Sequence, residues 1–193
     1  MKDLLLHRLL WSIILTATGC STITLSPGAS LIHKSPKGTV QLLPIVDQSF
    51  VADHPTLINH ETVRTVLQGL TAEPLVHSST MPTDGDTPMR VFSDADAEFL
   101  TPLLADGLSR AKPTQTVGFT VSPSAGSGAE PAAGIIYRHH NALHVLLSPT
   151  SGRKVSGFRP RAAAHIERAP AYSQDWTPGT QVAVINLERL HTP

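Results

Sequence analysis

The spacing of the apolar residues changes once along this 193-residue chain, and that change limits the folds open to it. Up to Ala111 the clearest patterns have helical spacing, whereas from Thr116 onward apolar and polar residues alternate as in half-buried strands. Helices followed by a run of strands predict an α+β fold. We expect two helices packed on a small, mostly antiparallel sheet. Residues 73–90 and 123–132, rich in turn-forming and small residues, predict long loops.

The first helix is expected over residues 60–71, where apolar residues recur at the helical interval. Asn59 precedes this segment and is suited to cap it, because its side chain can accept a hydrogen bond from a free backbone N–H. Upstream, residues 40–46 form a short apolar run. Pro44 within it confines the strand to a sheet edge or ends it early.

The second helix is expected from Ser93, a favourable N-cap residue, to Ala111. Pro102 interrupts the segment and predicts a kink, or a restart of the helix with Thr101 as a new cap. Gly107 lies near the apolar stripe, where the absence of a side chain permits close packing on a sheet.

The second half of the chain contains several predicted strands. They cover residues 116–121, 135–138, 142–147 and 182–187, with a further strand placed at 162–167. The three residues His139, His140 and Asn141 are expected to form a hairpin loop, since Asn tolerates the left-handed conformation that such loops need.

The sole cysteine, Cys20, follows a charged start and an apolar run over residues 4–17. Charge, a short apolar stretch and small residues are the layout of a secretory signal, and the run is shorter than the roughly 20 residues of a membrane span. Residues 15–21 (LTATGCS) resemble the lipobox of bacterial lipoproteins. Family members usually carry Leu where this chain has Ala17.

The resemblance implies that residues 1–19 are cleaved and that Cys20 then carries the lipid. The chain would be a lipid-anchored protein of the cell envelope, and Ser21 is compatible with the outer membrane, facing the periplasm. We expect residues 20–38 to be the lipidated N-terminus and a flexible tether, and residues 39–193 to form a single α+β domain. The membrane, reached through that lipid, is then the first partner.

Charge excludes one class of partner and suggests another. The formal net charge is +0, which argues against nucleic acid, because nucleic-acid binding usually needs a basic face. One segment is nevertheless basic: Arg153, Lys154, Arg159, Arg161 and Arg168. We interpret it as a surface for an envelope protein or for anionic envelope material. The alternative is a solvated loop.

His139, His140 and His144 are the densest group of side chains that can bind a metal, and imidazoles suit Zn²⁺ or Cu²⁺. Adjacent side chains diverge in a hairpin, and no Asp, Glu or Cys lies within seven residues of the group. We therefore predict no metal, with two imidazoles facing solvent from the loop and His144 on the outer face of the sheet.

Nucleophilic catalysis needs a nucleophile beside a base that a carboxylate orients. The ingredients occur together in Asp47, Ser49, Asp53, His54 and His60. No motif arranges them, and no phosphate-binding Gly loop or HExxH sequence is present. We predict no catalytic residue and no cofactor. A non-enzymatic binding or assembly module is the expected function; a hydrolase acting on envelope material and a cell-wall or lipid binder remain the alternatives.

Overall fold

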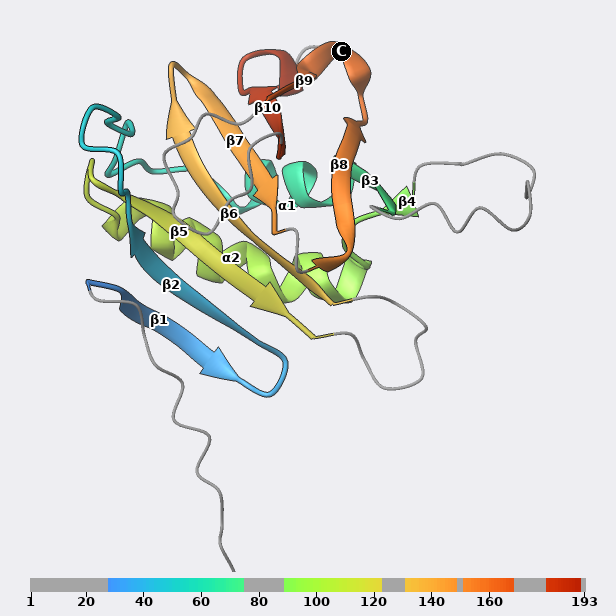
Figure 1. Ribbon diagram of the computed structural model, residues 1–193. Coiled ribbons are helices and arrows are strands. Elements are labelled where there is room, and N and C mark those ends of the chain that lie inside the picture. The colour runs from blue at the N-terminus through green and yellow to red at the C-terminus, as the bar shows by residue number, and fades with distance from the viewer. Residues whose placement is uncertain (1–27, 75–88, 123–130, 149–150, 169–179, 192–193) are drawn as a thin grey trace, which may run out of the picture.

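The computed structural model describes residues 28–74, 89–122, 131–148, 151–168 and 180–191 (Figure 1). Within these ranges two α-helices and two antiparallel sheets form an α+β arrangement, so the predicted fold class is confirmed. The lipobox-like segment with Cys20, and most of the loops expected over 73–90 and 123–132, lie outside the described residues.

The larger sheet has seven strands and is bigger than the small sheet we expected. In spatial order its strands are β1 (Ser30–Ser35), β2 (Gly38–Pro44), β5 (Gln115–Val121), β6 (Ala132–His139), β7 (Ala142–Leu147), β10 (Gln181–Asn186) and β9 (Ala164–Arg168). Every neighbouring pair is antiparallel. The second sheet has three strands, β4 (Met89–Arg90), β3 (Leu70–Pro74) and β8 (Arg153–Phe158).

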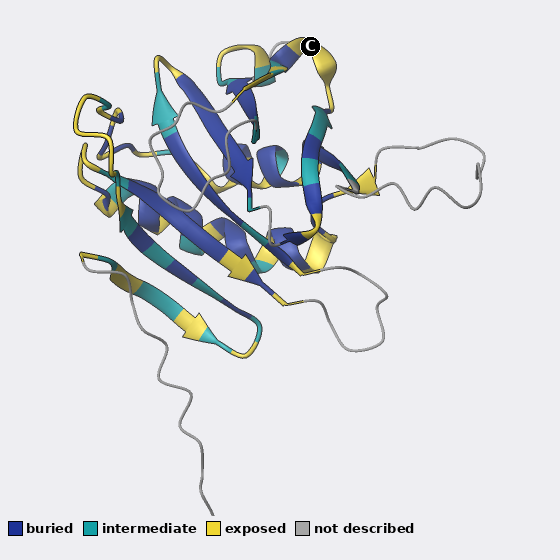
Figure 2. Ribbon diagram, in the orientation of Figure 1, coloured by how far each residue is buried: buried dark blue, intermediate teal, exposed yellow. Residues whose placement is uncertain are grey.

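One face of the larger sheet is covered along its whole width. Helix α2 (Asp94–Arg110) packs against β1, β2, β5 and β6, and α1 (His60–Gly69) packs beside α2. Strand β8 of the smaller sheet covers β7, β10 and β9 on the same side. The buried residues between these layers form the main core, visible as the dark ribbon in Figure 2.

Both predicted helix caps are confirmed. The side chain of Asn59 accepts a hydrogen bond from the backbone N–H of Thr62 at 2.7 Å. Ser93 and Asp96 form a reciprocal capping box at the start of α2. The first helix ends two residues earlier than predicted, because Leu70 begins β3 and pairs with Phe158 of β8.

The restart predicted at Pro102 is wrong, since α2 runs through this residue without interruption. Thr101 donates its hydroxyl to the carbonyl of Ala97 at 2.6 Å instead of capping a new helix. Pro102 itself is exposed, so water can reach the backbone beside it and compensate for the missing hydrogen bond. Gly107 packs closely on the sheet, as expected: a Cβ there would lie 2.7 Å from Cγ1 of Val117.

Strand β1 occupies part of the segment that we expected to be a tether. Residues 30–38 form this strand and its turn into β2, so the tether prediction is wrong there. Ile32 packs against the main core and the ring of His33 lies edge-on to Phe99, with centroids 5.6 Å apart. An edge strand with a bulge needs few apolar residues, which explains why no alternating pattern marked it.

The hairpin between β6 and β7 is tighter than predicted. Its loop has two residues, His140 and Asn141, both with left-handed backbone (φ 47° and 61°), as a two-residue hairpin turn requires. His139, expected in the loop, pairs with Ala142 in the ladder. The register of His139 fixes the face of the sheet on which its side chain lies.

Candidate binding pocket

Strand register gathers several histidines on the face of the sheet opposite α2. Tyr137 pairs with His144, His144 with Val184, and Val184 with His165, so one row crosses β6, β7, β10 and β9. Directly opposed residues share a face, and so does His139, two positions from Tyr137. Three imidazoles from three strands therefore meet on one side.

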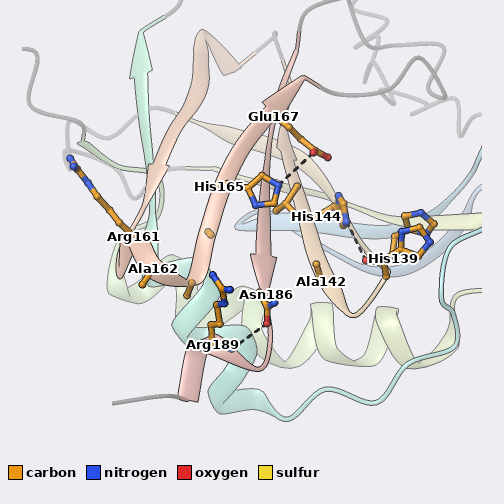
Figure 3. A pocket seen from close by; sticks show the side chains of 13 residues that line it. His139, Ala142, His144, Arg161, Ala162, His165, Glu167, Asn186 and Arg189 are labelled. Carbon is orange, nitrogen blue, oxygen red and sulfur yellow. Dashed lines mark hydrogen bonds and ion pairs between the residues drawn. The ribbon is translucent and has the colours of Figure 1, made fainter.

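These imidazoles line a hollow of about 690 Å³ at the hairpin end of the sheet (Figure 3). Its walls come from the β6–β7 hairpin, β9, β10 and two short 3-10 helices, η2 (Arg161–Ala163) and η3 (Arg189–His191). We call it the histidine pocket; it is lined by His139, His140, Ala142, His144, Arg161, Ala162, Ala163, Ala164, His165, Glu167, Val184, Asn186 and Arg189. Its volume lies within the range of small-molecule sites.

Aromatic stacking holds the hairpin side of the histidine pocket. The rings of His139 and His140 lie 3.8 Å apart between centroids, and Phe50 lies 4.8 Å from His139 on the β2–α1 connection. His144 stacks on Tyr137 at 4.9 Å. The imidazoles are thus held by packing rather than being loose surface side chains.

His144 is neutral at neutral pH. Burial lowers its pKa to about 4, even though the carbonyl of His139 and the carboxylate of Glu167 favour the charged ring. Its Nε2 lies 3.3 Å from the carbonyl oxygen of His139, which can only accept, so the proton is on Nε2. Nδ1 is then an acceptor, buried without a hydrogen-bond partner. His144 does lie on the outer face of the sheet, opposite α2, as expected, but it is only 7% exposed because Tyr137 and its neighbours cover it.

The three histidines that the sequence analysis considered as metal ligands, and for which it predicted no metal, do share one pocket, together with His165 and Glu167. In the described ranges, however, no three His, Cys, Asp or Glu side chains come close enough to hold a metal ion. The rings of His139 and His144 are 6.0 Å apart between centroids, and His144 uses Nε2 for the carbonyl of His139. The arrangement is suited to hydrogen bonding rather than to coordination.

The structure divides the basic segment into separate environments. Arg153 is only 7% exposed and donates to the carbonyl of Pro131 at 3.3 Å, so it is part of the interior. The ammonium of Lys154 lies 3.8 Å from the carboxylate of Glu73. Of the five basic residues, these two are engaged within the fold.

The other three basic residues, Arg159, Arg161 and Arg168, are exposed. Arg159 and Arg161 line a second hollow of about 280 Å³ between β8 and β9. This hollow shares Arg161 and His165 with the histidine pocket, so Arg161 connects the two. Sequence reasoning had singled out Arg161 but missed Arg189 and His165, which carry no local motif.

The loop residues considered for nucleophilic catalysis do not assemble. The hydroxyl of Ser49 donates to the carboxylate of Asp47 at 2.6 Å, and with the Ser49 backbone N–H it lowers the pKa of that carboxyl. His54 is buried with neither ring nitrogen bonded, and His60 is the exposed first residue of α1. Asp47 and Ser49 thus form a turn, and His54 is hydrogen-bonded to neither of them.

Comparison with known proteins adds no assignment: no protein-family model matches the chain, and neither a curated protein nor a solved structure does. None of the helices in the described part of the chain is long and apolar enough to cross a membrane.

Proposed function

We propose that this chain is a lipid-anchored protein of the bacterial cell envelope that acts as a non-enzymatic binding module. Attachment is through the lipid on Cys20, at the outer membrane and facing the periplasm, and the histidine pocket is the binding site. The resemblance of residues 15–21 to a lipobox supports the attachment. The chemistry of the pocket supports the binding role.

The observation that carries the binding role is the composition of the pocket lining. Among the described residues it offers imidazoles, guanidiniums and one amide beside Ala and Val, with a single carboxylate and no hydroxyl, thiol or amine side chain. The described lining therefore has no hydroxyl or thiol nucleophile and only one of the two carboxyl groups that glycoside hydrolysis ordinarily uses. Eight of the thirteen lining residues are polar or charged and five are Ala or Val, which suits the binding of a polar ligand.

One observation favours a hydrolase as the second candidate. Nε2 of His165 lies 3.6 Å from Oε2 of Glu167, and a carboxylate beside an imidazole is the arrangement that orients a general base. Activation of a water molecule by His165 would then act on envelope material. Both side chains are exposed, which leaves the reacting groups in bulk water and makes this function the weaker of the two.

The attachment is tested by Cys20→Ala in the full-length protein, produced in a bacterium that processes lipoproteins and is fed an alkyne-labelled fatty acid. We expect the variant to lose the label and to leave the membrane fraction. Thr24→Ala, beyond the lipobox-like segment, is the matched control and keeps both. Unchanged labelling and membrane retention in Cys20→Ala would overturn the lipoprotein assignment.

The choice between binding and hydrolysis is tested by incubating the full-length protein with isolated cell-envelope material and measuring released fragments by mass spectrometry. The proposal expects no release above that from buffer. Release that His165→Gln abolishes, while Arg168→Gln leaves it unchanged, would replace the binding module by the hydrolase.

A further inference from the structure

The charged groups around the histidine pocket are mostly positive. Among the described lining residues Arg161 and Arg189 outnumber the one carboxylate, that of Glu167, so the formal charge of the lining is +1 with the imidazoles neutral. Neither arginine has an ion-pair partner among the described residues. Arg161 points away from the imidazoles in Figure 3, so Arg189 supplies the guanidinium that is free to receive an anion beside them.

The negative groups nearby are already occupied. The carboxylate of Glu167 lies against His165, as described above. Glu188, next to Arg189 in the chain, accepts a hydrogen bond from the side-chain amide of Asn141 at 2.8 Å. It therefore steadies the hairpin tip and does not line the pocket. No other carboxylate of the described residues lines the hollow.

The cationic and imidazole groups of the histidine pocket leave space between them for an anion. In Figure 3 Arg189 and His139 lie on opposite sides of the pocket, with Ala142 and Asn186 between them. The ring of His140 packs against that of His139, with centroids 3.8 Å apart. A guanidinium matches the planar or tetrahedral oxygens of carboxylate and phosphate, and it binds them in a bidentate manner. Imidazole N–H groups across the gap can donate to the remaining oxygens.

We infer that the histidine pocket binds an anionic group, a phosphate or a carboxylate, between Arg189 and the imidazoles of the hairpin tip. The inference rests on the proposed binding function and specifies its ligand class. The anion is carried by a lipid headgroup or by a soluble molecule of the envelope. In either case the recognising chemistry is the same.

Sulfate is the probe for the anion site, because it carries two negative charges and does not titrate near neutral pH. Calorimetric titration of the full-length protein, held in an uncharged detergent at pH 7 and fixed ionic strength, is expected to show binding of sulfate. Arg189→Gln should weaken binding about tenfold. Arg168→Gln, which removes an exposed charge outside the pocket, is the matched control and should change it less than twofold.

Equal binding by Arg189→Gln and Arg168→Gln, or no binding of sulfate by the unaltered protein, would overturn the inference. Circular dichroism of each variant verifies that the fold is retained. Neither result affects the labelling test of Cys20, so failure here and failure of the attachment are distinguishable.

Vesicles identify the source of the anion. The full-length Cys20→Ala protein, which has no lipid of its own, is mixed with phosphatidylglycerol or phosphatidylcholine vesicles and floated on a gradient. Co-flotation with phosphatidylglycerol alone, lost on adding Arg189→Gln, assigns the site to a lipid headgroup. Sulfate binding without such flotation assigns it to a soluble anionic ligand.

Discussion

The imidazole of His144 lies nearly parallel to the ring of Tyr137, its partner across the β6–β7 ladder, with centroids 4.9 Å and planes 14° apart. Tyr137 is fully buried and His144 is 7% exposed. A titratable ring is therefore built into the sheet face that forms the wall of the histidine pocket, and its protonation opposes folding.

Acid should destabilise the protein through His144. The folded pKa of His144, about 4, lies below the unfolded value. Above about pH 6.5 the ring is neutral in both the folded and the unfolded state, so its protonation removes no stability there. Between about 6.5 and 4 the unfolded chain binds the proton more tightly, which removes about 2 kcal/mol of stability at pH 5. We expect His144→Phe, which keeps a stacked ring, to reduce this loss in urea unfolding at pH 7.5 and 5. An identical pH dependence in both proteins would contradict the assignment.

Protonation of His54, in the β2–α1 connection, should also destabilise the protein in acid. Burial lowers its pKa to about 4, aided by Arg138 and opposed by Asp53, and neither ring nitrogen has a hydrogen-bond partner. We expect His54→Leu to retain stability at pH 7.5, because it removes two unsatisfied polar atoms, and to flatten the loss of stability between pH 6.5 and 4. His60→Leu, at an exposed position, is the control and should leave the acid dependence unchanged.

Gly107→Ala should destabilise the protein even though alanine favours helices. The gain in helix propensity is about 1 kcal/mol. The new methyl group would lie 2.7 Å from Cγ1 of Val117, a stiff side chain on β5, and 3.1 Å from Cδ1 of Ile32. Overpacking of this kind costs about 1–3 kcal/mol, so we expect a net loss. Thermal unfolding measures it; an increase in Tm would show that α2 can move away from the sheet.

Ser93→Ala should remove the capping box of α2 and cost about 1 kcal/mol in the free energy of unfolding. The Ser93 hydroxyl accepts from the backbone N–H of Asp96 at 3.1 Å, and Asp96 in turn forms an ion pair with Lys37. Ser109→Ala, which removes a hydroxyl bonded to the carbonyl of Asp106 in the same helix, is the control. Equal effects of the two changes in denaturant titrations would mean that the cap contributes little.

Local patterns in the sequence predicted the structural features that are determined by residues close together in the chain. Asn59 and Ser93 marked the helix starts, and alternation marked β5, because caps and alternating strands leave their signature within a few residues. Strand β8 was missed because only Val155 and Phe158 of its six residues are apolar and a register shift interrupts its pairing with β3.

The histidine pocket needed information that no local pattern contains. His139, His140 and His144 were visible as a group, but His165, Glu167 and Arg189 join them only through the order β7-β10-β9 of the sheet. The same long-range pairing buried Arg153 while leaving Arg161 at the pocket. The five basic residues that lie close together in the sequence therefore occupy three different environments in the fold: interior, ion-paired and exposed.

Photo-cross-linking in intact cells tests most directly whether the histidine pocket is the binding site. His140, exposed at the hairpin tip, is replaced by the photoreactive residue p-benzoylphenylalanine in the full-length protein, and adducts are identified by mass spectrometry. Arg64, exposed on α1 and outside the pocket lining, is replaced in the matched control. We expect a dominant adduct from position 140 that is absent from position 64. The same adducts from both positions, or none from position 140, would contradict a binding module that works through this pocket.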